Sequence, residues 1–147
     1  MNDSMNNDIN EKYPKEDRNL SVCESLIMKT IWDAGEDLSV PELTSALKTR
    51  YGKDYARTTI ATFLLKLSEK DFIRTYRRGK LSFVHAVKDE EDYKLRRLQE
   101  ETDFWYGGSV SRLVSALCRA RKLTPKDMED LKNAYDELDV PDQPRGN

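Results

Sequence analysis

The residues that most constrain this fold are 57–86, where the spacing of apolar side chains changes from a helical to an extended pattern. Ile60, Leu64 and Leu67 recur on one helix face, so we expect a helix of about four turns that buries this stripe. Two runs rich in aromatic and β-branched side chains follow, with Gly79 between them, as in a β-hairpin. A helix followed directly by a short basic hairpin predicts a winged helix.

The faces of this helix outside the buried stripe carry small, hydroxylated or basic side chains. Small side chains allow a close approach to DNA, and hydrogen-bond donors can meet phosphates and base edges. We therefore expect the helix and the hairpin to bind double-stranded DNA. The residues expected to contact it are Arg57, Thr58, Thr59, Thr62, Lys66, Arg77, Arg78 and Lys80.

Each part of this predicted DNA-binding face has a structural alternative. Threonine suits helix N-termini, so Thr58, Thr59 and Thr62 could cap the helix instead. Basic residues in the hairpin could keep exposed strand edges from aggregating. We expect the apolar Phe63 and Leu65 to pack in the core or against another helix and not to wedge between bases.

The distribution of charge favours an anionic partner. The 147-residue chain has a formal net charge of −2, and residues 48–80 contain ten Lys or Arg against three Asp or Glu. This segment therefore carries +7 and the remaining residues carry −9. A basic segment in an acidic protein indicates a directed anionic partner, and a solvated charged face is the alternative.

Two capping patterns define helices upstream of this segment. Ser21 with Glu24 and Ser39 with Glu42 each form a capping box, and a short strand can form at Leu38. The fold class we expect is mainly α with a small β-hairpin. It combines an N-terminal winged helix-turn-helix domain with a C-terminal helical dimerisation region.

The C-terminal half is predicted to be helical and to form a homodimer. Its three apolar stripes span only about 50 residues, too few for an independent core, and only 37% of the whole chain is hydrophobic. A symmetric partner is the simplest cover for these stripes, and helices folded back on the winged helix are the alternative. The residues expected at the dimer interface are Leu95, Leu98, Trp105, Leu113, Leu117, Met128, Leu131 and Tyr135.

The predicted organisation has four parts. Residues 1–19 and 140–147 are polar tails that we expect to be disordered, residues 20–88 form the winged-helix domain, and residues 89–139 form the dimerisation region. No apolar run is long enough for a signal peptide or a membrane span. We therefore expect a cytoplasmic protein without a membrane partner.

No cofactor, metal ion or enzymatic activity is expected. His85 is the only histidine, so a structural role is favoured over metal binding. Cys23 and Cys118 are expected to be reduced thiols, and a redox sensor would require their Cα atoms to approach within about 7 Å. No phosphate-binding loop or nucleophile–base pair indicates catalysis.

The aromatic residues 104–106 are expected to pack between helices, with a ligand pocket as the alternative.

Three motifs occur in an order found in one protein family. Leucine-serine begins and isoleucine-tryptophan ends residues 20–32, residues 58–67 read TTIATFLLKL, and residues 106–109 read YGGS. Together they resemble the BlaI/MecI/CopY family of bacterial winged-helix repressors over about residues 20–138. The resemblance implies a homodimer that binds an operator and represses transcription. A two-fold symmetric dimer would require a pseudo-palindromic operator.

Several residues depart from the pattern of that family. Asp71 stands where glycine is usual, at a turn position that can require a positive φ, and Lys66 stands where arginine is usual. The C-terminal region lacks the cysteine-rich motif of the copper-responsive branch. Residues 98–104 lack the asparagine-phenylalanine bond at which the β-lactam-responsive branch is cleaved. The releasing signal, whether a regulatory protease or a small molecule, stays open.

A winged helix can also bind another protein and never contact DNA. Such a module would more often present an apolar or mixed patch than a strongly basic face. The charge of residues 48–80 therefore favours DNA over the protein-interaction alternative.

Overall fold

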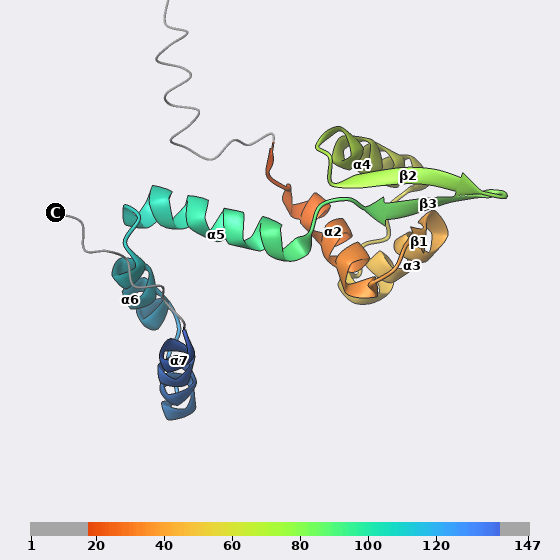
Figure 1. Ribbon diagram of the computed structural model, residues 1–147. Helices are drawn as coiled ribbons and strands as arrows, with labels where there is room; N and C mark the ends of the chain where they lie inside the picture. The colour runs from red at the N-terminus through yellow and green to blue at the C-terminus, as the bar shows by residue number, and fades with distance from the viewer. Residues whose placement is uncertain (1–17, 139–147) are drawn as a thin grey trace, which may run out of the picture.

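The computed structural model describes residues 18–138, so most of the N-terminal tail and all of the C-terminal tail predicted above lie outside the described residues. Helices α2 to α4 gather around a small sheet, and α5 leads away from them to α6 and α7 (Figure 1). This arrangement confirms the mainly α fold with an N-terminal winged helix. The elements are α2 (Val22–Ala34), β1 (Leu38–Ser39), α3 (Val40–Tyr51), α4 (Arg57–Glu69), β2 (Ile73–Arg78), β3 (Leu81–Ala86), α5 (Glu90–Tyr106), α6 (Val110–Ala120) and α7 (Pro125–Glu137).

Side-chain caps begin α2 and α3. Ser21 Oγ accepts a hydrogen bond from the Glu24 amide at 3.2 Å, and Glu24 Oε1 accepts one from the Ser21 amide at 2.7 Å. Ser39 and Glu42 repeat the arrangement, so both predicted capping boxes are confirmed. Helix α4 begins differently, because its N-cap is Ala56, which makes no side-chain cap hydrogen bond. The alternative that the threonines of α4 cap its N-terminus is therefore wrong.

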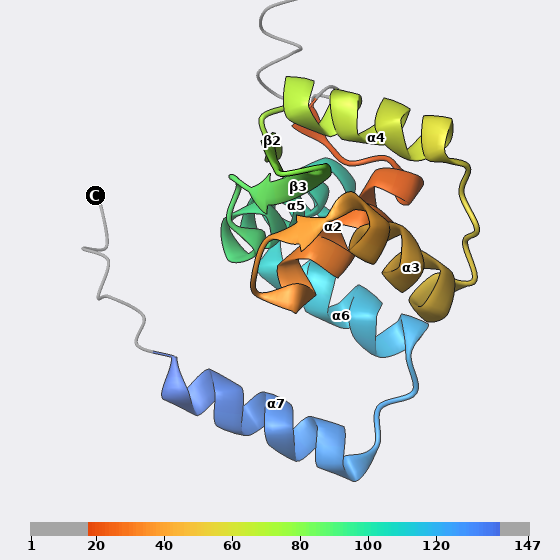
Figure 2. The ribbon, with the colours of Figure 1, turned by 90° about the vertical axis from the view of Figure 1, so that its right-hand side faces the viewer.

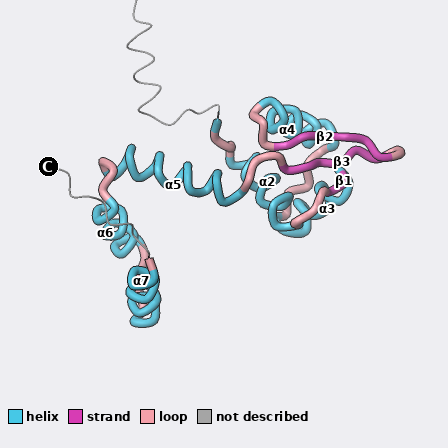
Figure 3. The backbone as a smooth tube through the Cα atoms, viewed as in Figure 1, coloured by secondary structure: helices cyan, strands magenta, loops and turns pink. Residues whose placement is uncertain are grey.

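The three strands form an antiparallel sheet in the order β1-β3-β2. Arg78 pairs with Leu81, which leaves Gly79 and Lys80 as the two residues of the turn. Gly79 has φ +64°, a left-handed conformation that glycine adopts without strain and that hairpin turns favour. The hairpin of β2 and β3 extends beyond the helices, so that its tip projects from the winged helix (Figure 3).

Asp71 forms the turn between α4 and β2. It has φ 63° and is the one described non-glycine residue with a positive φ, as the missing family glycine predicts. Its amide donates to the Ser68 carbonyl at 3.1 Å, and the Phe72 amide donates to the Leu67 carbonyl at 3.0 Å. Asp tolerates the left-handed region better than bulkier residues do. The turn therefore keeps its geometry without glycine.

The core lies between α4, the sheet and the first two helices. Ile60, Leu64 and Leu67 are buried and confirm the predicted stripe of α4. Helix α2 contributes buried residues from its middle, whereas Cys23 is half-buried and Ala34 is exposed near its two ends. The other buried apolar residues are Ile27, Met28, Ile31, Leu43, Leu47, Phe72, Ile73 and Val84.

A buried ion pair connects the start of α2 with the end of α4. Glu24 is 2% exposed, and its Oε1 accepts a hydrogen bond from Lys70 Nζ at 2.7 Å. Lys70 Nζ also donates to the Asn19 carbonyl at 3.0 Å. Burial raises the pKa of Glu24, but the hydrogen bonds from Lys70 and Ser21 outweigh it and hold that pKa below its usual value. The carboxylate is therefore charged inside the fold.

An aromatic cluster connects α5 to the winged helix. The Tyr93 ring lies 5.9 Å from Trp32 and 5.3 Å from Phe72, measured between centroids. The Tyr93 hydroxyl accepts a hydrogen bond from the Leu20 amide at 3.1 Å, and Trp32 Nε1 donates to the Lys88 carbonyl at 2.9 Å. Because these contacts come from several segments, they fix the direction in which α5 leaves the domain.

The residues before α2 also hold α5. Arg96 donates to the Arg18 carbonyl at 2.9 Å and to Asn19 Oδ1 at 3.2 Å. Both partners belong to the tail predicted to be disordered. They are instead ordered, because Lys70, which follows α4, and Arg96 of α5 donate hydrogen bonds to these residues.

Helices α6 and α7 do not fold back onto the winged helix. They lie beyond the far end of α5 (Figure 1), and the overlap of α6 with α2 and α3 in Figure 2 comes from the viewing direction. Neither helix contains a buried residue. No helix among residues 18–138 is long and apolar enough to cross a lipid bilayer. The arm formed by α5, α6 and α7 thus leaves most of its predicted interface residues exposed in a single chain.

Replacing Lys70 by methionine tests the buried ion pair. Lys70→Met leaves the Glu24 carboxylate buried without its cationic partner, which is expected to cost about 3 kcal/mol of unfolding free energy at pH 7. The lowered pKa of Glu24 means that the pair stabilises the fold above the usual glutamate pKa and loses this effect as pH falls through the folded-state value. Urea denaturation should therefore show a smaller difference between variant and wild type at pH 4. Equal differences at both pH values would contradict this account.

Candidate nucleic-acid interface

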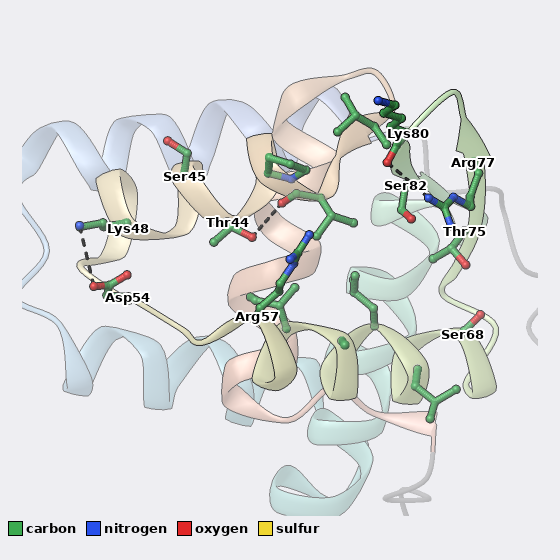
Figure 4. A pocket seen from close by; sticks show the side chains of 17 residues that line it. Thr44, Ser45, Lys48, Asp54, Arg57, Ser68, Thr75, Arg77, Lys80 and Ser82 are labelled. Carbon is green, nitrogen blue, oxygen red and sulfur yellow. Dashed lines mark hydrogen bonds and ion pairs between the residues drawn. The ribbon is translucent and has the colours of Figure 1, made fainter.

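A groove with a volume of about 960 Å³ runs between α3, α4 and the β2–β3 hairpin (Figure 4). Four cationic side chains line it: Lys48 from α3, Arg57 from α4, and Arg77 and Lys80 from the hairpin. Asp54 is the one carboxylate among the lining residues, and it lies 3.8 Å from Lys48. The groove is therefore electropositive on all three of its walls.

The outward face of α4 adjoins this groove. Thr58, Thr62 and Lys66 are exposed, and Thr59 is half-buried. Thr62 Oγ1 donates to the Thr58 carbonyl at 3.0 Å, which leaves the lone pairs of this oxygen free to accept. A polar, hydroxyl-bearing surface thus continues from the cationic groove along the first turns of α4.

The structure separates two arginines of the hairpin that the sequence places together. Arg77 lines the groove, whereas Arg78 lies with its guanidinium 5.9 Å from the centroid of the Phe83 ring and does not line it. Successive side chains of a strand point to opposite faces, which explains the separation. Arg57, Arg77 and Lys80 therefore converge in one groove, while Arg78 belongs to the other face of the hairpin.

The polar residues of α3 are absent from the residues predicted to contact DNA. Thr44, Ser45 and Lys48 line the groove, and they lie on the side of α3 that does not enter the core. Leu43 and Leu47 are buried on the inner side of α3. The helical periodicity of residues 40–51 therefore places the three polar residues on the outer side and could have identified them.

Phe63 and Leu65, two apolar residues of α4 outside its buried stripe that were predicted to pack, differ in their exposure. The ring of Phe63 is half-buried and lies edge-on to Tyr55 at 5.6 Å, which confirms its predicted packing role. Leu65 is 61% exposed and lines the groove, so its predicted packing role in the core or between helices is wrong for this chain. The side chain extends away from the stripe that α4 buries, which explains the difference.

One carboxylate anchors the hairpin to the loop before β1. Asp37 accepts a hydrogen bond from the Tyr76 hydroxyl at 2.6 Å, and its second oxygen lies 2.7 Å from His85 Nδ1. The bonds with Tyr76 and His85 hold the pKa of Asp37 below its usual value. His85 thus has the structural partner that a non-metal role predicts, and Asp37 positions β2 and β3 together.

The remaining candidate site residues do not converge. Cys23 accepts a hydrogen bond from the Tyr55 hydroxyl at 3.3 Å, and both it and Cys118 are free thiols on α2 and α6, which lie apart in Figure 1. Within residues 18–138 no group of three or more His, Cys, Asp or Glu side chains is arranged to hold a metal ion.

Three helices, a basic hairpin and an electropositive groove define this part of the chain as a winged helix. Residues 20–137 match the family model described as penicillinase repressor. The chain belongs to the penicillinase repressor family, which is a family of transcriptional repressors and not of enzymes. It is 24% identical over 119 residues to the penicillinase repressor of Staphylococcus aureus, covering 81% of this chain and 92% of that protein. The resemblance found in the sequence motifs is therefore confirmed.

Replacing Asp37 by asparagine tests whether it anchors the hairpin. Asp37→Asn removes the charge that strengthens the bonds with Tyr76 and His85, so amide hydrogen exchange in residues 76–82 should become several-fold faster. Hydrogen–deuterium exchange with mass spectrometry measures this change. Asp54→Asn is the matched control, because it makes the same substitution in the groove without touching the sheet. Equal exchange rates in both variants would show that Asp37 does not hold the hairpin.

Proposed function

We propose that this protein is a homodimeric repressor that binds a pseudo-palindromic operator in double-stranded DNA. The observation that carries the proposal is the groove between α3, α4 and the hairpin, which is lined by four cationic side chains and only one carboxylate. Phosphate groups supply the complementary charge, and their neutralisation by Lys and Arg releases condensed counterions. An operator contact of this kind prevents transcription by occupying the DNA.

The proposed contacts divide between base edges and the backbone. Helix α4 enters the major groove, where Thr58 and Thr62 reach base edges with their hydroxyl and methyl groups. Arg77 and Lys80 reach the phosphate backbone or the minor groove from the hairpin, and Lys48 contacts phosphates from α3. This division gives α4 the sequence preference and gives the other elements most of the affinity.

The dimer is proposed to form through the arm of α5, α6 and α7. Seven of its eight predicted interface residues are between 42% and 73% exposed in the single chain, and Leu113 is half-buried. Exposed apolar surface on this scale is more typical of an interface than of a monomer. A two-fold symmetric partner covers the same stripe on both chains.

Selection of bound fragments from genomic DNA tests the function as a whole. The expected result is enrichment of one pseudo-palindromic sequence whose half-sites lie about one helical turn of DNA, or more, apart. A protein that binds all fragments alike, or none, would contradict the proposal. Binding to none would favour the protein-interaction alternative.

A charge placed on the apolar stripe of α7 tests the dimer. Leu131→Asp buries a carboxylate in the proposed interface and should convert the dimer to monomer at micromolar concentration. Asn133→Asp adds the same charge two residues further along, on the opposite side of the helix, and should leave the dimer intact. Size-exclusion chromatography with light scattering distinguishes these outcomes. A monomeric wild type, or a dimeric Leu131→Asp variant, would rule out this interface.

Two substitutions separate base reading from phosphate anchoring. Thr62→Ala should cost about 1–3 kcal/mol on the selected operator and much less on random DNA. Lys80→Ala should weaken both DNAs alike and lower the slope of log affinity against log salt by about 0.9 for each lost phosphate contact, with two such contacts in a dimer. Fluorescence anisotropy at several salt concentrations measures both effects. If Thr62→Ala weakens both DNAs equally, the assignment of base reading to Thr62 is wrong.

A further inference from the structure

Leu65 presents an apolar side chain in an otherwise polar and cationic surface. It is 61% exposed and lines the groove together with Arg57 and Ala61. Lys66 is exposed directly beside it. An isolated exposed leucine is common on protein surfaces, but this one lies where the proposed function places DNA.

The position of Leu65 continues a row of exposed residues on α4. Thr58, Ala61, Thr62 and Leu65 follow the spacing i, i+3, i+4 and i+7, and all four are exposed. Homeodomain recognition helices read the major groove with residues at this spacing. Ala61 adds only a methyl group between its neighbours, which allows the row to approach base edges closely. If the threonines contact base edges as proposed, Leu65 lies over the base pairs that follow.

The chemistry of the major groove limits what leucine can recognise there. Leucine neither donates nor accepts hydrogen bonds, so its favourable contact on a base edge is the 5-methyl group of thymine. Placing it against a hydrogen-bonding base edge instead would desolvate that edge without compensation. The cations Arg57 and Lys66 on either side favour a polyanionic occupant of this surface over an apolar protein.

We propose that Leu65 recognises a thymine in each half-site by contact with its 5-methyl group, and thereby helps determine which operators this repressor prefers. The inference rests on the proposed function and adds a specificity-determining residue to it. The structure provides the exposed position, its place in the row, and the electropositive groove around it.

Deoxyuridine substitution tests the contact, because deoxyuridine is thymidine without the methyl group. The full-length protein is measured on the operator selected from genomic DNA, with each thymine replaced in turn. We expect one position per half-site at which the replacement weakens wild-type binding by about fourfold, the effect of one buried methyl group. Leu65→Ala should weaken binding to the unmodified operator and show no further loss at that position.

Two further variants make the result specific to Leu65. Val22→Ala removes another exposed aliphatic side chain, at the start of α2 and outside the groove, and should keep the full fourfold response. Leu65→Met keeps an apolar side chain and should keep part of the response. Both positions are exposed, so thermal melts should be unchanged in all three variants.

The outcomes distinguish this inference from the function on which it rests. If an operator is selected but no thymine responds differently in Leu65→Ala and wild type, the inference is wrong and the proposed function stands. The same holds if Leu65→Ala weakens operator and random DNA equally. If no operator is selected, the proposed function fails, and the inference fails with it.

Discussion

The packing of α4 on the core determines which side chains the proposed DNA-binding face presents. Ile60, Leu64 and Leu67 are buried along one side of the helix, which turns Thr58 and Thr62 outward. The N-terminus of α4 has no side-chain cap. The helix is therefore held in its rotational position by this apolar stripe and, at its C-terminal end, by the Lys70–Glu24 pair. A rotation of one residue, about 100°, would bury hydroxyls and expose leucines. The recognition proposed for α4 therefore depends on ordinary core packing.

The arm must have a fixed direction if a dimer is to read two half-sites. Tyr93 packs between Trp32 and Phe72, and Phe72 directly follows the turn that ends α4. The segment before α2 adds hydrogen bonds to both α4 and α5, through Lys70 and Arg96. These contacts relate the orientation of the arm to that of α4. In a two-fold dimer, that relation sets the distance between the two copies of α4 and hence the spacing of half-sites.

Local sequence patterns predicted the elements, and tertiary contacts decided the details of the site. The two capping boxes and the stripe of α4 each follow from residues within a few positions of one another. The positive φ of Asp71 is instead indicated by the family resemblance, in which glycine is usual at that turn. The exposure of Leu65 and the separation of Arg77 from Arg78 follow the periodicities of their helix and strand. The groove that Leu65 and Arg77 line depends on how the hairpin lies against α3 and α4, which periodicity alone does not contain. Asp37 bonds to Tyr76 and His85, which lie 39 and 48 positions further along the chain. No short-range pattern could identify this anchor.

The most direct test of the central claim maps where duplex DNA contacts the chain. Amide resonances of the full-length protein are compared by NMR with and without the selected operator. We expect the largest changes in residues 57–66 and 77–82, smaller ones at Lys48 and its neighbours on α3, and little change in α6 and α7. Changes confined to the arm, with the groove unaffected, would contradict the assignment of this face to DNA.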